Sequence, residues 1–175
     1  GVGQATAVML AEQGWNVAIL GRRIETLEET IQQAAAHSGQ VNAFPCDVGN
    51  REQVAETAKA IGEKLGEIEV LVNSAGTNCK ERYLPDISDA DYHATMDANM
   101  NGAFYLVQEF LPGMRERKLG TVVNVSSDSG YEPNLKAGVA YIMSKMGIAG
   151  LSRSINCEEG PNNVRSCVIY PGEID

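Results

Sequence analysis

The segment Thr121–Lys145, TVVNVSSDSGYEPNLKAGVAYIMSK, combines a buried strand, a polar loop and the start of a helix. Residues 121–125 are apolar and mostly β-branched, which is typical of a short strand inside a sheet. Ser127 follows this strand. In parallel α/β sheets, ligands bind in the crevice outside the carboxyl ends of the strands. The pattern therefore predicts that Ser127 lies in a binding site.

A packed helix is predicted from about Val139 to Ile155, because small and apolar residues recur there at helical spacing. Tyr141 and Lys145 are four residues apart, so they lie on one face of this helix. A neighbouring ammonium group favours the phenolate form of a tyrosine. The pair is therefore suited to acid–base chemistry on a carbonyl or an alcohol.

Composition narrows the classes of protein to consider. The 175 residues are enough for about one domain with a sizeable core. A net charge of −9 and the lack of a basic run argue against a nucleic-acid partner. The four cysteines show no Cys-x-x-Cys spacing, so we expect reduced thiols in the cytoplasm and neither a metal site nor a disulfide framework. No apolar run reaches the ~18 residues of a membrane span, so we expect no membrane partner.

Apolar runs alternate with amphipathic segments along the chain, which predicts a parallel sheet with right-handed crossovers and helices on both faces. The fold class is thus α/β, a Rossmann-type doubly wound sheet in three α/β/α layers. The expected strands lie at residues 15–20, 41–46, 68–72, 121–125 and 164–170, and the expected helices at 5–11, 24–36, 51–65, from Ser88 toward Pro112, and 139–155. Asn50 and Gln53 resemble a capping box, and Ser88 resembles an N-cap.

Glycines and arginines near the N-terminus suggest a dinucleotide site. Gly1 and Gly3 open a helix that Gly14 closes, a weak signal for phosphate binding that a tight turn would explain as well. Arg22 and Arg23 follow the second expected strand, where arginine accommodates a 2′-phosphate and an acid would accept a ribose hydroxyl. We therefore expect NADP rather than NAD. The alternative is a pair of solvated arginines at the start of a helix.

Two further segments contain small or helix-breaking residues with a possible function: residues 73–76 and residues 99–102. Residues 73–76 follow a buried strand and are small enough for the backbone to approach a ligand, although a simple turn would explain them equally well. Residues 99–102, Asn-Met-Asn-Gly, interrupt the long helix that begins at Ser88. Because asparagine and glycine are poor helix formers, we expect a backbone irregularity there or a merely tolerated sequence.

These motifs occur together and in one order, and over its whole length the chain resembles the short-chain dehydrogenase/reductase family. The resemblance rests on Asp47-Val48, Asn73-Ser74-Ala75-Gly76, Asn99-x-x-Gly102, Ser127, Tyr141-x-x-x-Lys145 and Pro171-Gly172. It implies a cytoplasmic oxidoreductase that uses NADP(H) for reversible hydride transfer between nicotinamide and a carbonyl or secondary alcohol. The substrate could be of the 3-oxoacyl, steroid, sugar or xenobiotic ketone type. The family commonly forms homodimers or homotetramers.

The resemblance also implies a role for each matching residue. Tyr141 would be the general acid/base, Ser127 would hydrogen-bond the substrate oxygen, and Lys145 would assist Tyr141 and hold the nicotinamide ribose. Asn99 would bend the long helix and seat a water that connects Lys145 to solvent. The expected cofactor-binding residues are Gly1, Gly3, Arg22, Arg23, Asp47, Val48, Asn73, Ala75, Gly76, Tyr141, Lys145, Pro171 and Gly172.

The sequence departs from the family pattern in a few places. Ser74 replaces a second asparagine, and Ser127 precedes Tyr141 by fourteen residues, one more than is common. Ser126 and Ser129 are lesser candidates for the role of Ser127. The resemblance places the family's first strand before Gly1 and its substrate loop and last strand after Asp175. We therefore expect residues 1–175 to be a single dinucleotide-binding catalytic domain, truncated at both ends, with two unpaired strand edges. We expect it to fold poorly alone, which a cooperative thermal transition would contradict.

Two other functions remain open at this stage. One is a non-catalytic NADP-binding regulator or scaffold on the same fold, since a fold does not fix a function. The other is a related epimerase or dehydratase, which shares the Tyr-x-x-x-Lys motif.

Overall fold

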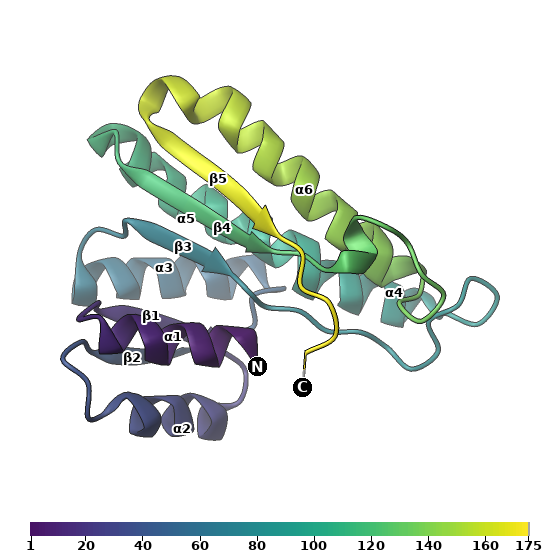
Figure 1. Cartoon of the computed structure of the whole chain (residues 1–175), viewed down its shortest axis with the longest axis horizontal. Coiled ribbons are helices and arrows are strands. Elements are labelled where there is room, and N and C mark those ends of the chain that lie inside the picture. Colours follow the sequence, from purple (N-terminus) through teal and green to yellow (C-terminus); the bar gives the residue numbers. More distant parts are fainter. Residues whose placement is uncertain (175) are drawn as a thin grey trace.

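The computed structural model describes residues 1–174, which form five strands and six α-helices (Figure 1). Asp175, the last residue of the predicted domain, lies outside this range. The strands are β1 (Val17–Gly21), β2 (Val41–Pro45), β3 (Val70–Asn73), β4 (Gly120–Val125) and β5 (Val164–Ile169). The helices are α1 (Val2–Glu12), α2 (Ile24–Ala34), α3 (Arg51–Leu65), α4 (Asp89–Met96), α5 (Gly102–Arg117) and α6 (Val139–Glu159).

The strands are all parallel, but they form two sheets. β1 pairs with β2, and β4 pairs with β3 on one side and β5 on the other. Within the described residues β1 and β3 are not paired, so the expected pair of free strand edges is confirmed. Two of the expected strands begin later than predicted, at Val17 and Val70. Trp15 belongs to the turn after α1, where its N–H donates to Leu10 O (3.1 Å).

Helices lie on both sides of the strands, which confirms the α/β fold (Figure 1). α1 and α2 pack against each other and against β1 and β2, whereas α5 and α6 pack against β4. Fully buried Val54, Met114, Val122 and Val164 join α3, α5, β4 and β5 in one core. Each such side chain contributes about 1.5–3 kcal/mol by leaving water. Within residues 1–174, no helix is long and apolar enough to cross a membrane.

α3 begins where the sequence predicts, because Asn50 caps it, and it ends at Leu65 as predicted. Asn50 Oδ1 accepts from the N–H groups of Glu52 (3.1 Å) and Gln53 (3.0 Å). The predicted capping box also requires Asn50 N to donate to the Gln53 side chain, and this part of the prediction is wrong. Gln53 Oε1 accepts from Asp47 N instead (2.9 Å). The Gln53 side chain therefore fixes the end of β2. The predicted cap Ser88 is confirmed, since its hydroxyl accepts from Asp91 N (3.1 Å).

The predicted irregularity in the long helix is confirmed as a π-helical turn, Asp97–Asn101, between α4 and α5. The prediction that this helix runs toward Pro112 is confirmed, but the helix extends further than predicted. Pro112 lies inside α5, which continues to Arg117 and ends with Lys118 in the left-handed conformation (φ 54°). Met114 beyond the proline is completely buried, so packing of this turn against the core overrides the local preference of proline.

Candidate active site

Ser127 stands just beyond the end of β4 and caps a short 3-10 turn, Asp128–Gly130. Its side chain is almost covered, with 9% of the residue exposed. The hydroxyl donates to Asp128 Oδ1 (2.8 Å) and accepts a longer bond from Ser129 N (3.3 Å). Asp128 N donates to Pro171 O (2.9 Å), so this segment is tied to the chain that follows β5.

Tyr141 and Lys145 project from the first turns of α6. Lys145 is 4% exposed, and its Nζ donates to Val125 O (3.0 Å) and lies 5.6 Å from the centroid of the Tyr141 ring. Burial lowers the pKa of Lys145 from 10.5 to about 8, because the charged form loses hydration. The predicted pairing of these two side chains on one helix face is therefore present in the structure.

The serine segment and α6 are locked together by direct contacts. Ser126 Oγ donates to Lys145 O (2.8 Å), which leaves this lesser candidate without a free proton for a substrate. A Cβ on Gly130 would lie 2.5 Å from Ser126 Oγ and 2.9 Å from Lys145 Cβ. Since such contacts are closer than real atoms approach, glycine is required at this position. The contact fixes how Ser127 sits relative to Lys145.

Asn99 joins the π-helical turn to both neighbouring segments and is 1% exposed. Its Nδ2 donates to Thr77 O (2.9 Å) and Ser144 Oγ (3.1 Å), and its Oδ1 accepts from Thr77 N (2.7 Å). A Cβ on Gly76 would lie 3.2 Å from Lys145 Nζ. Asn99, Gly76 and Lys145 therefore meet, although they come from three separate parts of the chain.

A cavity of about 1230 Å³ lies between the β1–β2 sheet and β3. Its lining includes the whole of β1 and β3, so most of this volume is the gap between the two sheets; Arg22, Arg23 and residues 73–76 line it where these strands end. Asn73 Oδ1 is buried and has no hydrogen-bond partner within residues 1–174, so it can accept from a bound group. Nine predicted residues line this cavity: Gly1, Gly3, Arg22, Arg23, Val48, Asn73, Ala75, Gly76 and Asn99.

The remaining predicted residues lie outside the cavity lining. Asp47 Oδ1 accepts from Gly49 N (3.0 Å), and its Oδ2 is 3.9 Å from an Arg22 nitrogen, so it stands beside a residue that does line the cavity. Pro171 contacts the serine segment through its carbonyl. The others that do not line it are Ser127, Tyr141, Lys145 and Gly172.

Sequence reasoning overlooked several polar residues that support the site. Asn73 Nδ2 donates to Asn124 Oδ1 (2.9 Å), and Asn124 Nδ2 donates to Ser166 Oγ (3.1 Å), so a buried polar chain crosses three strands. Asp128 beside Ser127 was also missed, although an acid between two serines is visible in the sequence. The asparagines gave no such signal, because pairing across strands depends on register.

Parallel strands with helices on both sides, and polar residues gathered where β3 and β4 end, are typical of α/β proteins that bind ligands at this edge of the sheet. A model of the short chain dehydrogenase family matches residues 1–175. The chain therefore belongs to the short-chain dehydrogenase/reductase family, as the sequence motifs predicted.

Relatives with curated descriptions agree with this membership. An uncharacterized oxidoreductase of Mycobacterium tuberculosis is 34% identical over 97% of this chain and 51% of its own length. The chain thus spans about half the length of the first curated relatives it matches. The 3-oxoacyl-[acyl-carrier-protein] reductase FabG of Thermotoga maritima is 30% identical over 100% of this chain and 70% of its own length.

Solved structures share the fold. A metagenomic short-chain oxidoreductase in complex with NADP is 30% identical, with a TM-score of 0.92 over 99% of this chain and 78% of that one. An NAD⁺-bound xylitol dehydrogenase is 29% identical, with a TM-score of 0.90 over 98% of this chain and 65% of that one. Both nicotinamide cofactors therefore occur among the similar proteins.

Proposed function

We propose that this protein is an NADP(H)-dependent ketoreductase and alcohol dehydrogenase, and that residues 1–175 form a single dinucleotide-binding catalytic domain. One observation carries the proposal: Lys145 is buried at the end of β4 with its ammonium over the Tyr141 ring and next to Gly76 of the cavity. Burying an ionisable amine is costly, and such groups cluster at functional sites. Membership of an oxidoreductase family supports the same conclusion.

In the proposed mechanism, bound NADPH supplies the hydride that a substrate carbonyl carbon receives. Tyr141 donates a proton to the carbonyl oxygen, and Ser127 hydrogen-bonds that oxygen. Lys145 supports the acid–base work of Tyr141 and holds the nicotinamide ribose. Its lowered pKa, about 8, lets it exchange a proton at near-neutral pH. Asn99 holds the turn beside Lys145 and would seat the water that connects this lysine to solvent.

The cavity residues would hold the cofactor. Phosphate groups would lie at the N-terminus of α1, where Gly1 and Gly3 allow a close approach. Asp47 and Val48 would contact the adenine, Asn73, Ala75 and Gly76 the adenosine side, and Pro171 and Gly172 the nicotinamide.

Cofactor choice would depend on the two arginines that follow β1. Exposed Arg22 and Arg23 line the cavity, and their guanidinium groups match the oxygens of a 2′-phosphate. We therefore favour NADP over NAD. Since similar structures hold either NADP or NAD⁺, this choice rests on the arginines.

The substrate would be a small carbonyl compound or alcohol, of the 3-oxoacyl, steroid, sugar or xenobiotic ketone type. The similarity to a 3-oxoacyl reductase supports the first of these. We further propose a cytoplasmic homodimer or homotetramer.

The decisive experiment follows NADPH oxidation with a panel of ketones, in the wild type and in Tyr141→Phe. Removing the hydroxyl should lower kcat by about 10³- to 10⁴-fold with little change in NADPH affinity, because the proton donor is lost while the ring remains. Tyr92→Phe, a partly buried tyrosine in α4, serves as the matched control and should keep its activity. Turnover near wild-type level in Tyr141→Phe would sink the assignment.

A further inference from the structure

Asp128 is the one carboxylate bonded to the candidate catalytic serine among the described residues. Its Oδ1 accepts from Ser127 Oγ (2.8 Å), Ser129 N (2.6 Å) and Ser129 Oγ (3.2 Å). These bonds, first the one from Ser127, lower the pKa of Asp128 below its ordinary value of 3.8. Asp128 is exposed whereas Ser127 is nearly covered. A negative charge therefore stands beside the hydroxyl that would contact the reacting oxygen.

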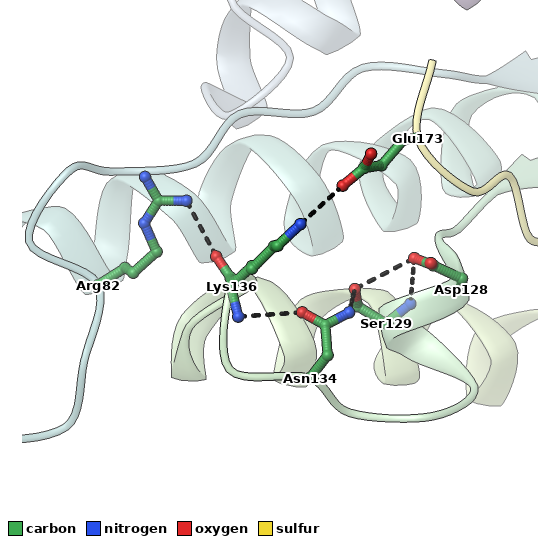
Figure 2. A network of polar contacts seen from close by, with 6 residues as sticks. All are labelled: Arg82, Asp128, Ser129, Asn134, Lys136 and Glu173. Atoms are coloured by element: carbon green, nitrogen blue, oxygen red, sulfur yellow. Dashed lines mark hydrogen bonds and ion pairs between the residues drawn. The ribbon is translucent and has the colours of Figure 1, made fainter.

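A network of hydrogen bonds fixes this carboxylate in place (Figure 2). The backbone N–H of Asp128 donates to Pro171 O (2.9 Å). Ser129 Oγ, which donates to Asp128, accepts in turn from Asn134 Nδ2 (2.7 Å), and Asn134 Oδ1 accepts from Lys136 N (3.1 Å). Asp128 is thus held from both sides, by the chain after β5 and by the loop before α6.

One oxygen of this carboxylate is left over. The hydrogen bonds that reach Asp128 from residues 1–174 end on Oδ1, so Oδ2 can accept from a ligand. The lysine closest in the network, Lys136, pairs instead with Glu173 (3.1 Å). Both of these side chains are more than 85% exposed, so their ion pair is weak and does not bring a positive charge to Asp128.

This arrangement distinguishes between substrates by what lies next to their carbonyl group. A simple ketone offers only acceptor lone pairs, so Ser127 has to leave Asp128 in order to donate to it. A charge-assisted hydrogen bond is then lost. A hydroxyl on the neighbouring carbon offers a donor that can take the place of Ser127 on the carboxylate. A carboxylate group in place of that carbon would be repelled by Asp128.

We propose that Asp128 is a specificity-determining residue and that the substrate is an uncharged hydroxyketone, whose neighbouring hydroxyl donates to Asp128 while Ser127 donates to the reacting oxygen. This inference rests on the function proposed above. The chemistry balances as for any ketone: the carbonyl carbon receives hydride from NADPH, and its oxygen receives a proton from Tyr141. The products are a vicinal diol and NADP⁺.

The test compares three substrates that differ only at the neighbouring carbon: 1-hydroxy-2-butanone, 2-butanone and 2-oxobutanoate. kcat/KM with NADPH is measured for the wild type, Asp128→Ala and Asp128→Asn. Wild type should prefer the hydroxyketone to butanone by about tenfold, the worth of one hydrogen bond to a charged group, and should use 2-oxobutanoate worst. Asp128→Ala should lose the preference for the hydroxyl and gain activity on 2-oxobutanoate.

Asp128→Asn separates charge from hydrogen bonding. It keeps an acceptor oxygen, so it should retain part of the preference for the hydroxyketone while accepting 2-oxobutanoate. If Asp128→Ala does not fold, this variant carries the test. Glu56→Gln, an exposed acid on α3, controls for the change in net charge and should behave as wild type.

The outcomes separate this inference from the proposed function. Reduction of simple ketones with no preference for the hydroxyl, or an unchanged preference in Asp128→Ala, overturns the role of Asp128 and leaves the ketoreductase intact. A wild-type preference for 2-oxobutanoate also overturns it. No reduction of any carbonyl compound by the wild type overturns both.

Discussion

The polar side chains beside the two sheets differ in burial and in hydrogen bonding. Beside β3, β4 and β5, polar side chains are buried and bonded. Asn73, Asn124 and Ser166 form one chain, and Ser152 Oγ extends it from α6 (2.8 Å to Ser166 Oγ). Asn124 is completely buried. Buried bonds of this kind specify one arrangement, because breaking any of them leaves an unsatisfied polar group.

The end of the β1–β2 sheet is different. Arg22 is 66% exposed in its side chain, and its contact with Asp47 is long at 3.9 Å. Exposed ion pairs of this kind contribute at most about 1 kcal/mol. Arg23 starts α2 with no side-chain hydrogen bond at the cap. These side chains keep their hydrogen-bonding capacity for a ligand.

The difference indicates how the site is organised. The buried polar groups beside β3, β4 and β5 are fixed by hydrogen bonds within the protein, whereas the proposed cofactor-choosing arginines are exposed and keep their donors for a ligand. A change among the buried groups should therefore alter both stability and rate. A change among the arginines should alter only affinity for the cofactor.

The strongest way to break this comparison is Lys145→Met. The rate of NADPH-dependent reduction should fall about 10³-fold, as for loss of an acid–base group. The free energy of unfolding at pH 7 should nevertheless rise by about 2 kcal/mol, because the variant no longer buries an amine whose pKa is lowered to about 8. Chemical denaturation and steady-state kinetics measure the two effects.

The pH dependence of stability gives the same prediction a second readout. Between pH 8 and 10.5 the unfolded chain binds a proton that folded Lys145 has lost, so wild-type stability should rise with pH over this window. Lys145→Met should lack that rise. The exposed Lys59→Met is the control and should change neither rate nor slope. A destabilised Lys145→Met with an unchanged slope would show that burial does not strain this lysine.

The next largest effect is expected for Asn99→Ala, which removes the hydrogen bonds from the π-helical turn to Thr77 and Ser144. Thr77 would lose partners for both its N–H and its C=O. Leaving such groups unsatisfied should lower the free energy of unfolding by about 2–3 kcal/mol. The rate should fall as well, because the contact of Gly76 with Lys145 depends on this turn.

Asn101→Ala is the matched control for that variant. Asn101 lies in the same turn, but its side chain bonds only within it, to Asp97 Oδ1 (2.7 Å). Denaturation curves should show a clearly smaller loss for Asn101→Ala than for Asn99→Ala. Equal losses would mean that the turn itself, and not its bonds to Thr77, sets the stability.

Much of the fold was predictable, because several elements are determined by residues within or next to them. Asn50 fixed the start of α3, and the β-branched run at residues 121–125 identified β4. The π-helical turn was foreseen as an irregularity because asparagine and glycine cluster there. The extent of α5 was not, since the packing of Met114 decides it and packing is not local.

Some contacts of the candidate site could not be predicted from the sequence, for a related reason. The sequence shows which residue types are present and in what order, so it predicted Ser127, Tyr141 and Lys145 as candidates. It does not show where a hydroxyl proton points. The bond from Ser127 to Asp128 and the bonds of Asn99 to Thr77 depend on backbone geometry after β4 and β3. A pattern of residue types cannot specify that geometry.

The smallest effect is expected for Arg22→Ala, which changes one of the exposed arginines after β1. This change should weaken NADPH binding about tenfold and leave NADH binding unchanged, because only NADPH carries the phosphate that a guanidinium would bind. Titration of both cofactors, followed by fluorescence, measures the ratio. The free energy of unfolding should stay within about 0.5 kcal/mol of wild type, since Arg22 is exposed.

Salt provides the sharper form of this test. Attraction between an exposed guanidinium and a phosphate is screened, so raising the ionic strength should narrow the gap between wild type and Arg22→Ala for NADPH. Arg165→Ala, an exposed arginine on β5, should match wild type with both cofactors. Equal affinity of the wild type for NADH and NADPH would refute the arginine argument. The exposed arginines after β1 would then have no role in cofactor choice.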